Sequence, residues 1–405
     1  MEMTYTPPVD ELAAVRSRAL IVGGVGLAAC VLGLFVSPDH FFRAWLISYM
    51  LFLGIALGSM ALMMVQHLSG GQWGVFRRIF EASSRTLPLL LVLFLPLLLG
   101  LSRLYPWANP ELVAKDEVLH HRALYLNTTF WIVRAAIYFG GWLLLSATLN
   151  RLSRRQDTGD VAVNRTIQKV CGAGIVFYGL SITWAGIDWL MALDPHWYSS
   201  LFGFLMIGGQ GLSALSFTII AATLLYRTAP MNTLLKPSHF HDLGKLSLAF
   251  VMLWAYFNFS QFLLTYAANL VEEIPYMVTR THNGWQYLAL FLVTFHFAVP
   301  FALLLSRDLK RTSRRLVYVS LWILFARLVD LFMMVSPQFA PTGQNLFMAG
   351  GEHGGRIYVH WLDLAAPLGI GGIWVWMFFT ELAKRPLLAV GDPYLRESLQ
   401  SGGGH

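Results

Sequence analysis

Five ionisable residues stand inside stretches of sequence that are otherwise apolar: Asp188, Asp330, Arg134, Arg327 and His296. A charge held in hydrocarbon is costly. Such residues therefore pair with each other, face the interior of a helix bundle, or mark a route for ions or protons. Carboxylate and imidazole groups exchange protons readily, so we treat all five as candidates for proton transfer.

The spacing of these residues predicts two ion pairs. Asp188 and Arg134 lie toward the same end of neighbouring antiparallel stretches, where a fixed clamp between helices and a proton site fit equally well. Arg327 and Asp330 are three residues apart, so they share one helix face and are in contact. His296 stands mid-stretch, where it either passes protons or only hydrogen-bonds a neighbouring helix.

A line of polar residues runs along the apolar stretch between residues 246 and 268. This stretch is preceded by a group of ionisable residues: His239, His241, Asp242 and Lys245. The line consists of Tyr256, Asn258, Ser260, Gln261, Thr265, Tyr266 and Asn269. Such a line holds water and conducts protons, or its side chains join helices by hydrogen bonds. The sequence leaves both interpretations open.

The composition places these residues in a membrane protein. The chain has 405 residues, of which 56% are hydrophobic and 13% charged, and its mean hydropathy is +0.56. That leaves too little polar surface to cover a soluble globule. Ten predicted spans cover residues 20–36, 44–65, 87–101, 130–147, 171–193, 201–225, 246–268, 285–305, 316–335 and 361–383.

The apolar runs are too long for the strands of a barrel and lack alternation, so we expect an all-α polytopic protein, one membrane domain over residues 1–405. The N-terminus, the even-numbered loops and the C-terminus carry 21 of the 29 Lys and Arg residues, and the odd-numbered loops carry six. This bias predicts that both termini are cytoplasmic. It also explains the net charge of +7 without nucleic-acid binding.

Several kinds of redox or nucleotide chemistry lack their residues. Both cysteines, Cys30 and Cys171, lie within predicted spans, so the sequence offers no disulfide framework and no cysteine-rich metal or iron–sulfur site. A transmembrane haem needs two histidines at matching depth, and His296 has no such mate. No P-loop, dinucleotide fingerprint or CxxC pair occurs.

An internal match divides the spans into two groups. Asp188, Met191 and Pro195 recur as Asp330, Met333 and Pro337 at an offset of 142 residues. If this match is a repeat and not a coincidence, residues 44–193 form a first four-helix bundle and residues 201–335 a second, flanked by the first and last spans. The longer outward connections, residues 102–129 and 336–356, suit either docking of a partner or a lid.

Four phrases resemble a known family: residues 178–200 (YGLSITWAGIDWLMALDPHWYSS), 241–261 (HDLGKLSLAFVMLWAYFNFSQ), 295–315 and 327–337. Together they resemble the ActF subunits of bacterial alternative complex III, which belong to the NrfD and polysulfide-reductase group of membrane subunits. The resemblance covers roughly residues 15 to 385 and is most specific between Asp188 and Ser200.

The resemblance implies a subunit of a quinol-oxidising complex in the bacterial inner membrane, with no catalysis by this chain alone. It implies a sister subunit of the ActC type, small membrane subunits, lipids, and periplasmic subunits that carry iron–sulfur clusters and haem c. It implies no cluster or haem in this chain, and it leaves open whether the chain binds quinone or mainly provides proton routes. The family's outward-side acidic position maps onto Asp188.

Quinol oxidation releases two protons with two electrons, so a quinol site needs an apolar slot and a group that accepts protons. Asp188 with the nearby aromatic residues Trp184, Trp189, Trp197 and Tyr198 fits such a slot, although the same aromatics suit an interfacial belt. The runner-up function is a secondary transporter that couples ions through the buried carboxylates. A transporter with inverted repeats would hold its site at mid-membrane, whereas these charges lie off-centre.

Overall fold

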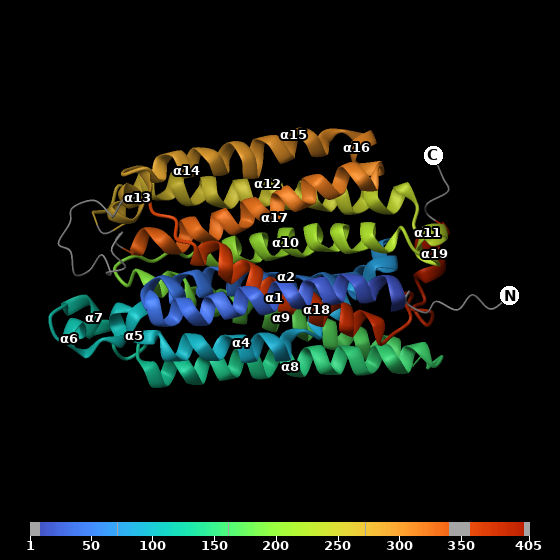
Figure 1. Cartoon of the computed structure of the whole chain (residues 1–405), viewed down its shortest axis with the longest axis horizontal. Coiled ribbons are helices and arrows are strands. Elements are labelled where there is room, and N and C mark those ends of the chain that lie inside the picture. The colour runs from blue at the N-terminus through green and yellow to red at the C-terminus, as the bar shows by residue number, and fades with distance from the viewer. Residues whose placement is uncertain (1–8, 71, 161, 272, 340–356, 401–405) are drawn as a thin grey trace.

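Ten long helices run side by side in the computed structural model, which describes residues 9–70, 72–160, 162–271, 273–339 and 357–400. All ten are long and apolar enough to cross a membrane, and no strand occurs in the described part of the chain. Both termini lie at one end of the molecule (Figure 1). The prediction of an all-α protein with ten spans is confirmed.

The spans are assembled from helices of unequal length. Eight are single long helices: α1 (Val9–Val36), α2 (Pro38–Ser69), α8 (Thr128–Asp157), α9 (Val163–Trp189), α10 (Phe202–Leu225), α12 (Pro237–Ala268), α17 (Ser313–Val335) and α18 (Leu362–Ala383). The third span joins η1 (Gln72–Phe76), α3 (Arg77–Ser84) and α4 (Leu87–Leu99), and the eighth joins α14 (Trp285–Phe291), η4 (Leu292–Ala298) and α15 (Val299–Leu305).

Short helices make up the connections. They are α5 (Leu101–Leu104), η2 (Pro106–Ala108), α6 (Pro110–Val113), α7 (Glu117–Arg122), η3 (Met191–Leu193), α11 (Met231–Leu234), α13 (Ile274–Thr281), α16 (Arg307–Arg311), η5 (Ser336–Gln338) and α19 (Leu395–Gln400). We call the end of the molecule that carries both termini the terminal end, and the end that carries α6, α7 and α13 the distal end (Figure 1).

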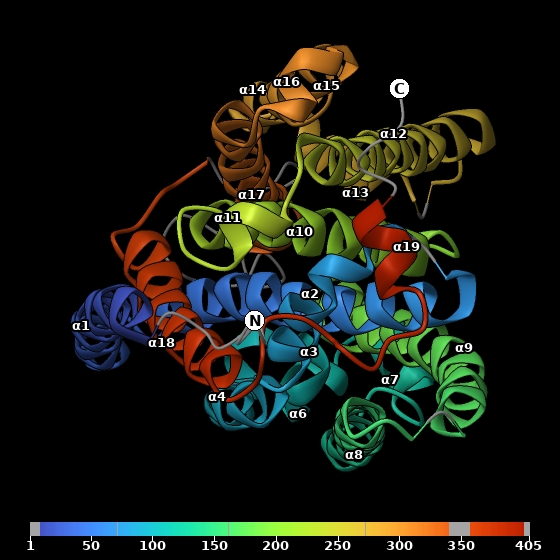
Figure 2. The same cartoon turned by 90° about the vertical axis from the view of Figure 1, so that its right-hand side faces the viewer.

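Helices α2 and α10 form the centre of the molecule. The end-on view in Figure 2 places them between the other spans, and 94% and 83% of their most apolar stretches are buried. Helices α1 and α12 and the eighth span are only 22% buried over the same length, so their apolar side chains face outward. A surface of this kind suits lipid or a neighbouring membrane subunit.

The helix contacts follow the same order in the two halves of the chain. The spans from α2 to α9 pack each against the next, and α9 returns to α2; the spans from α10 to α17 do the same, and α17 returns to α10. Between the halves, α2 contacts α17 and α10 contacts α9. This is the arrangement that two related four-helix bundles require, and the division into bundles stays a prediction.

The third span begins earlier than the sequence indicated. Residues 66–86 lie between two of the predicted spans, but helix α3 occupies part of this segment and is buried throughout. Its charged residues lower the hydropathy of the segment, although Arg77 and Glu81 pair with each other inside the protein.

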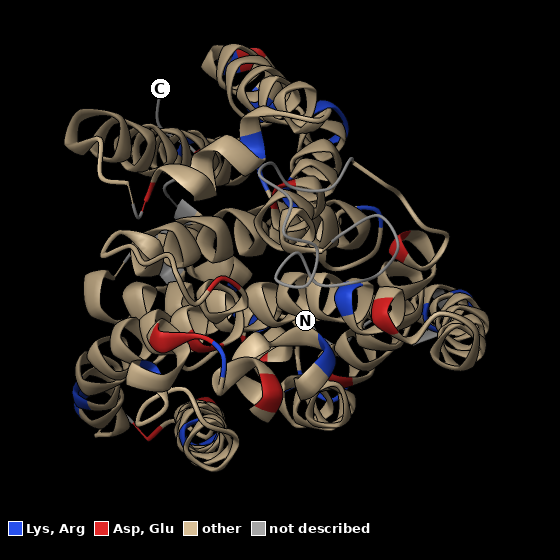
Figure 3. Ribbon diagram, turned by 90° about the vertical axis from the view of Figure 1, so that its left-hand side faces the viewer, with Lys and Arg blue, Asp and Glu red and all other residues tan. Residues whose placement is uncertain are grey.

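The first long connection of the distal end is folded against the bundle. The Tyr105 hydroxyl donates to the main-chain oxygen of Trp189 at 2.9 Å, and the Trp107 indole donates to that of Ala192 at 3.2 Å. Acidic and basic positions are interspersed over this end (Figure 3). Residues 340–356 of the other long connection lie outside the described part of the chain.

Helices α1 and α18 meet through glycine. A Cβ added to Gly26 would stand 2.4 Å from the main-chain nitrogen of Gly369, and one added to Gly372 would stand 2.4 Å from that of Gly23. Helix backbones in a membrane come this close only where side chains are absent. The first span is therefore held to the protein mainly by this seam.

We predict that Gly26→Ala weakens the seam, because the methyl group has only backbone to displace. Overpacking of this kind typically costs about 1–3 kcal/mol. The matched control is Gly24→Ala, since a Cβ at Gly24 meets nothing within 4 Å. Thermal unfolding in detergent should show a lower midpoint for the first variant alone, and equal midpoints would contradict the seam.

Candidate functional site

Asp188 and Arg134 form a closed ion pair at the distal end of the first half. The Arg134 side chain, on α8, donates from Nε and Nη2 to the two carboxylate oxygens of Asp188, on α9, at 2.8 Å each. The Tyr138 hydroxyl adds a third hydrogen bond at 2.8 Å, and Asp188 is completely buried. A guanidinium that donates to both oxygens of one carboxylate forms a bidentate pair with a fixed geometry.

The remaining contacts of Arg134 also lie within the protein. Its Nη1 donates to the main-chain oxygen of Tyr125 at 3.0 Å, and its guanidinium lies 3.9 Å from the Tyr125 ring centroid and 4.5 Å from that of Phe130. Of the two interpretations that the sequence left open, this geometry favours the clamp between α8 and α9.

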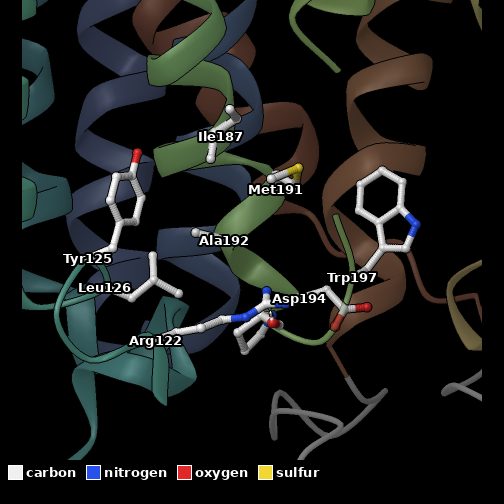
Figure 4. Close-up of a pocket in the computed structure, with 9 residues that line it drawn as sticks. Arg122, Tyr125, Leu126, Ile187, Met191, Ala192, Asp194 and Trp197 are labelled. Carbon is white, nitrogen blue, oxygen red and sulfur yellow. Dashed lines mark hydrogen bonds between the residues drawn. The ribbon is translucent and has the colours of Figure 1, made fainter. Parts of the chain in front are cut away.

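A small cavity lies beside this clamp (Figure 4). Its volume is about 200 Å³, and Tyr125, the neighbour of Arg134, forms part of its wall. Figure 4 shows residues of the α7–α8 connection on one side and of α9 and η3 on the other, with Asp194 close to Arg122. Arg122 donates to the main-chain oxygen of Pro195, which ties the connection to the start of the next loop. The volume is small for an organic ligand.

The aromatic residues expected around Asp188 do not line one slot. Trp189 is buried in the core, 4.9 Å from Phe94 between ring centroids, whereas Trp184 and Tyr198 are about half exposed. Trp197 stacks on Tyr276 of α13 at 3.6 Å and turns toward the second half of the chain. The structure therefore separates these four residues, and of them Trp197 reaches the larger cavity described below.

Asp330 is held more loosely than Asp188. Its Oδ2 accepts hydrogen bonds from Arg327, on the same helix, and from the Trp254 indole of α12 at 2.9 Å. Its Oδ1 accepts none from the described residues, and Asp330 lines a cavity in the protein's second half. The predicted contact between Arg327 and Asp330 is present, and one carboxylate oxygen is left for another partner.

His296 lies next to this carboxylate inside a π-helix, η4, which the sequence did not indicate. The imidazole is fully buried, and neither ring nitrogen has a hydrogen-bond partner among the described residues. It packs edge-on against Trp254, with ring centroids 4.4 Å apart, and lies within electrostatic range of Asp330 and Arg327. Single π-turns are rare and often occur at functional sites.

The cavity beside Asp330, which we call the α12–α17 cavity, has a volume of about 670 Å³. That volume is in the usual range for sites that bind organic ligands, and the wall is mainly apolar. Its lining residues are Trp197, Phe202, Leu205, Met252, Trp254, Ala255, Tyr256, Asn258, Phe259, Gln261, Phe262, Tyr276, Met277, Arg280, Thr281, Ala289, Leu292, Val293, Phe297, Asp330, Met333 and Met334.

The predicted entrance residues lie far along α12 from the cavity. Lys245 forms an exposed ion pair with Asp242 at 3.4 Å near the terminal end, with His241 beside them. Tyr256, which is about 16 Å further along the helix by its rise per residue, is exposed at the wall of the α12–α17 cavity. No chain of hydrogen bonds through the described residues joins the entrance to Asp330, so a conducting line along α12 would need water.

A buried charge network at the terminal end escaped the sequence analysis. Glu81 is completely buried and accepts hydrogen bonds from Arg77 at 2.9 Å, Arg78 at 2.6 Å and Arg385 at 3.1 Å. Arg77 also reaches Asp392 at 3.1 Å, which fastens the chain beyond α18 to α3. The spacing of Arg77, Arg78 and Glu81 at three and four residues was the available signal.

Comparison with protein-family models finds no match to this chain, and comparison with curated proteins finds no similar sequence. The functional argument therefore rests on the residues and their geometry.

The clamp interpretation of Asp188 predicts non-additive substitutions. Asp188→Asn leaves the buried Arg134 charge without its counterion and should destabilise the protein by about 3–5 kcal/mol. The double variant Asp188→Asn with Arg134→Met removes both charges and should be clearly more stable than the sum of the single losses. Thermal unfolding of the three variants measures this coupling, and additive losses would argue against a clamp.

Proposed function

We propose that this protein is an integral membrane subunit of a quinol-oxidising respiratory or photosynthetic complex of the alternative complex III type. Its contribution is a quinol slot in the α12–α17 cavity and a proton acceptor at Asp330. The observation that carries the proposal is a carboxylate with one unoccupied oxygen, Oδ1, at the wall of a large apolar cavity.

The chemistry of quinol suits this arrangement. Quinol oxidation gives up two electrons and two protons, and neither proton can leave an apolar slot without a base. Arg327 and Trp254 stabilise the carboxylate of Asp330 through Oδ2, so Oδ1 is free to accept a proton from a quinol hydroxyl. In this proposal the electrons pass to redox groups of a partner subunit. In the same proposal His296, which lies within electrostatic range of Asp330, takes the proton onward.

The partners follow from the same proposal. A sister membrane subunit of the ActC type and small membrane subunits would cover exposed apolar surface such as that of α1, with lipid against α12 and the eighth span. Subunits with iron–sulfur clusters and haem c would dock at the distal end, which the charge bias assigns to the periplasm of a bacterial inner membrane. The chain then acts as part of an oxidoreductase and not as an enzyme alone.

The lining of the cavity separates this proposal from a transporter. A secondary transporter for a polar solute would need a mainly polar site, whereas most residues that line the α12–α17 cavity are aromatic or aliphatic, and five are polar or charged: Asn258, Gln261, Arg280, Thr281 and Asp330. A quinol, whose ring is apolar apart from its two oxygens, matches this wall better than a polar solute does.

Purification tests the assignment to a complex. Extraction in a mild detergent through a tag on this chain should bring haem c absorbance and iron–sulfur subunits with it. A transporter would purify without redox partners and bind a solute. Isolation without any haem or iron–sulfur protein, from cells that contain them, would remove the proposal.

Asp330→Asn tests the proton acceptor. We expect quinol oxidation by the assembled complex to fall about 100-fold or more, because the amide cannot take a proton. Asp330→Glu keeps a carboxylate and should retain part of the rate. The control is Asp39→Asn, which changes an exposed ion pair with Arg103 at the same end. Normal turnover by an intact Asp330→Asn complex would exclude this role.

A further inference from the structure

Arg280 stands at the distal rim of the α12–α17 cavity in a stack of planar groups. It is a residue of α13, only 7% exposed, and its guanidinium lies 3.4 Å from the centroid of the Tyr276 ring. Tyr276 in turn stacks on Trp197 at 3.6 Å, with 5° between the ring planes. The stack fixes the guanidinium against the cavity wall, since all three residues line the cavity.

The hydrogen bonds of Arg280 go to main-chain oxygens. Nη1 donates to Tyr276 and Nη2 donates to Met334, each at 3.0 Å. No carboxylate of the described chain lies within ion-pair distance of it, and burial lowers the pKa of Arg280. A guanidinium has five N–H donors, so these two bonds leave capacity for an oxygen of a ligand.

The position of Arg280 relative to Asp330 follows from α17. Met334, which Arg280 contacts, is four residues beyond Asp330, and four helical residues rise by about 6 Å. Arg280 and Asp330 both line the same mainly apolar cavity, so a guanidinium donor and a carboxylate acceptor border one space that is large enough for an organic ligand.

The cavity is open toward the surface that faces the membrane. Tyr256 and Phe259 of α12 and Val293 of η4 line it and are all more than half exposed. These residues lie inside spans, where exposed apolar side chains meet lipid. A ligand from the lipid phase therefore reaches the cavity between α12 and η4 without passing through water.

We propose that Arg280 and Asp330 bind the two ring oxygens of a quinol, which enters the cavity sideways from the lipid between α12 and η4. Arg280 donates a hydrogen bond to the distal oxygen, as it would to the same oxygen of a quinone, and the Asp330 carboxylate accepts one from the hydroxyl at the other end of the quinol. Binding itself transfers no electrons. The inference rests on the proposed function in taking quinol as the ligand. It adds a binding residue and an entry route that the sequence did not indicate.

The test measures binding by the full chain in lipid nanodiscs, without partner subunits. Decylubiquinone or menadione is titrated, and quenching of tryptophan fluorescence reports occupancy, because Trp197 and Trp254 line the cavity. Arg280→Ala should weaken binding about tenfold or more, as expected for the loss of one charged hydrogen bond, and Arg280→Lys should restore part of it. Arg103→Ala, an exposed arginine at the same end, should bind as the wild type does.

A second pair of variants tests whether the ligand binds in this cavity. Ala289→Trp places a large side chain in the cavity and should abolish binding, whereas Ala298→Trp, at an exposed position of the same span outside the cavity, should not. Unfolding midpoints close to that of the wild type show that each variant is folded.

Wild-type affinity in folded Arg280→Ala or Ala289→Trp would overturn the inference. Binding of an anionic phospholipid through Arg280, without any binding of quinone by the wild-type chain, would overturn it as well. These measurements need no partner subunit, so they can fail independently of the purification test. If the chain purifies with haem c but does not bind quinone, the assignment to a complex stands and the proposed binding site is wrong.

Discussion

The cost of a charge in hydrocarbon is the constraint from which the rest of the structure follows. Each fully buried carboxylate inside the spans lies against at least one guanidinium, and the way the pair is closed differs from place to place. Glu81 sits among several arginines at the terminal end, where the pairs hold the chain beyond α18 in place. At the distal end the ion pairs lie beside cavities, so the hydrogen-bond donors and acceptors that they leave unused determine whether they can bind a ligand there.

Asp188 and Asp330, which the internal sequence match pairs with each other, form different sites. Asp188 receives its arginine from a neighbouring helix together with a tyrosine, and three donors use both of its oxygens. Asp330 receives its arginine from its own helix, three residues away, so the guanidinium approaches from one side. The second oxygen of Asp330 accepts no hydrogen bond from the described residues, and Asp330 lines the cavity. Asp188 joins two helices, whereas Asp330 keeps hydrogen-bond capacity beside a cavity.

Much of this architecture could be predicted from sequence, because span length and hydrophobicity are local properties. The pairing of Arg327 with Asp330 was predictable for the same reason, because the two residues are three apart in the sequence. The cavity was not predictable, since its wall comes from α12, α13, the eighth span and α17, and its volume depends on how they pack. The π-helix around His296 gave no signal in composition, and Arg280 read as an ordinary loop residue because α13 lies between two spans.

The connection between the two halves also belongs to the cavity wall. Trp197 follows the end of α9, and it stacks on Tyr276 of α13, which carries the stacked guanidinium of Arg280. In the same connection Asp194 accepts a hydrogen bond from Gln338, beyond α17, at 3.2 Å. The roof of the cavity is thus built from both halves at the distal surface. A protein that bound this surface would lie over residues that also line the cavity, so the proposed docking of partner subunits and the proposed binding of a ligand involve the same contacts.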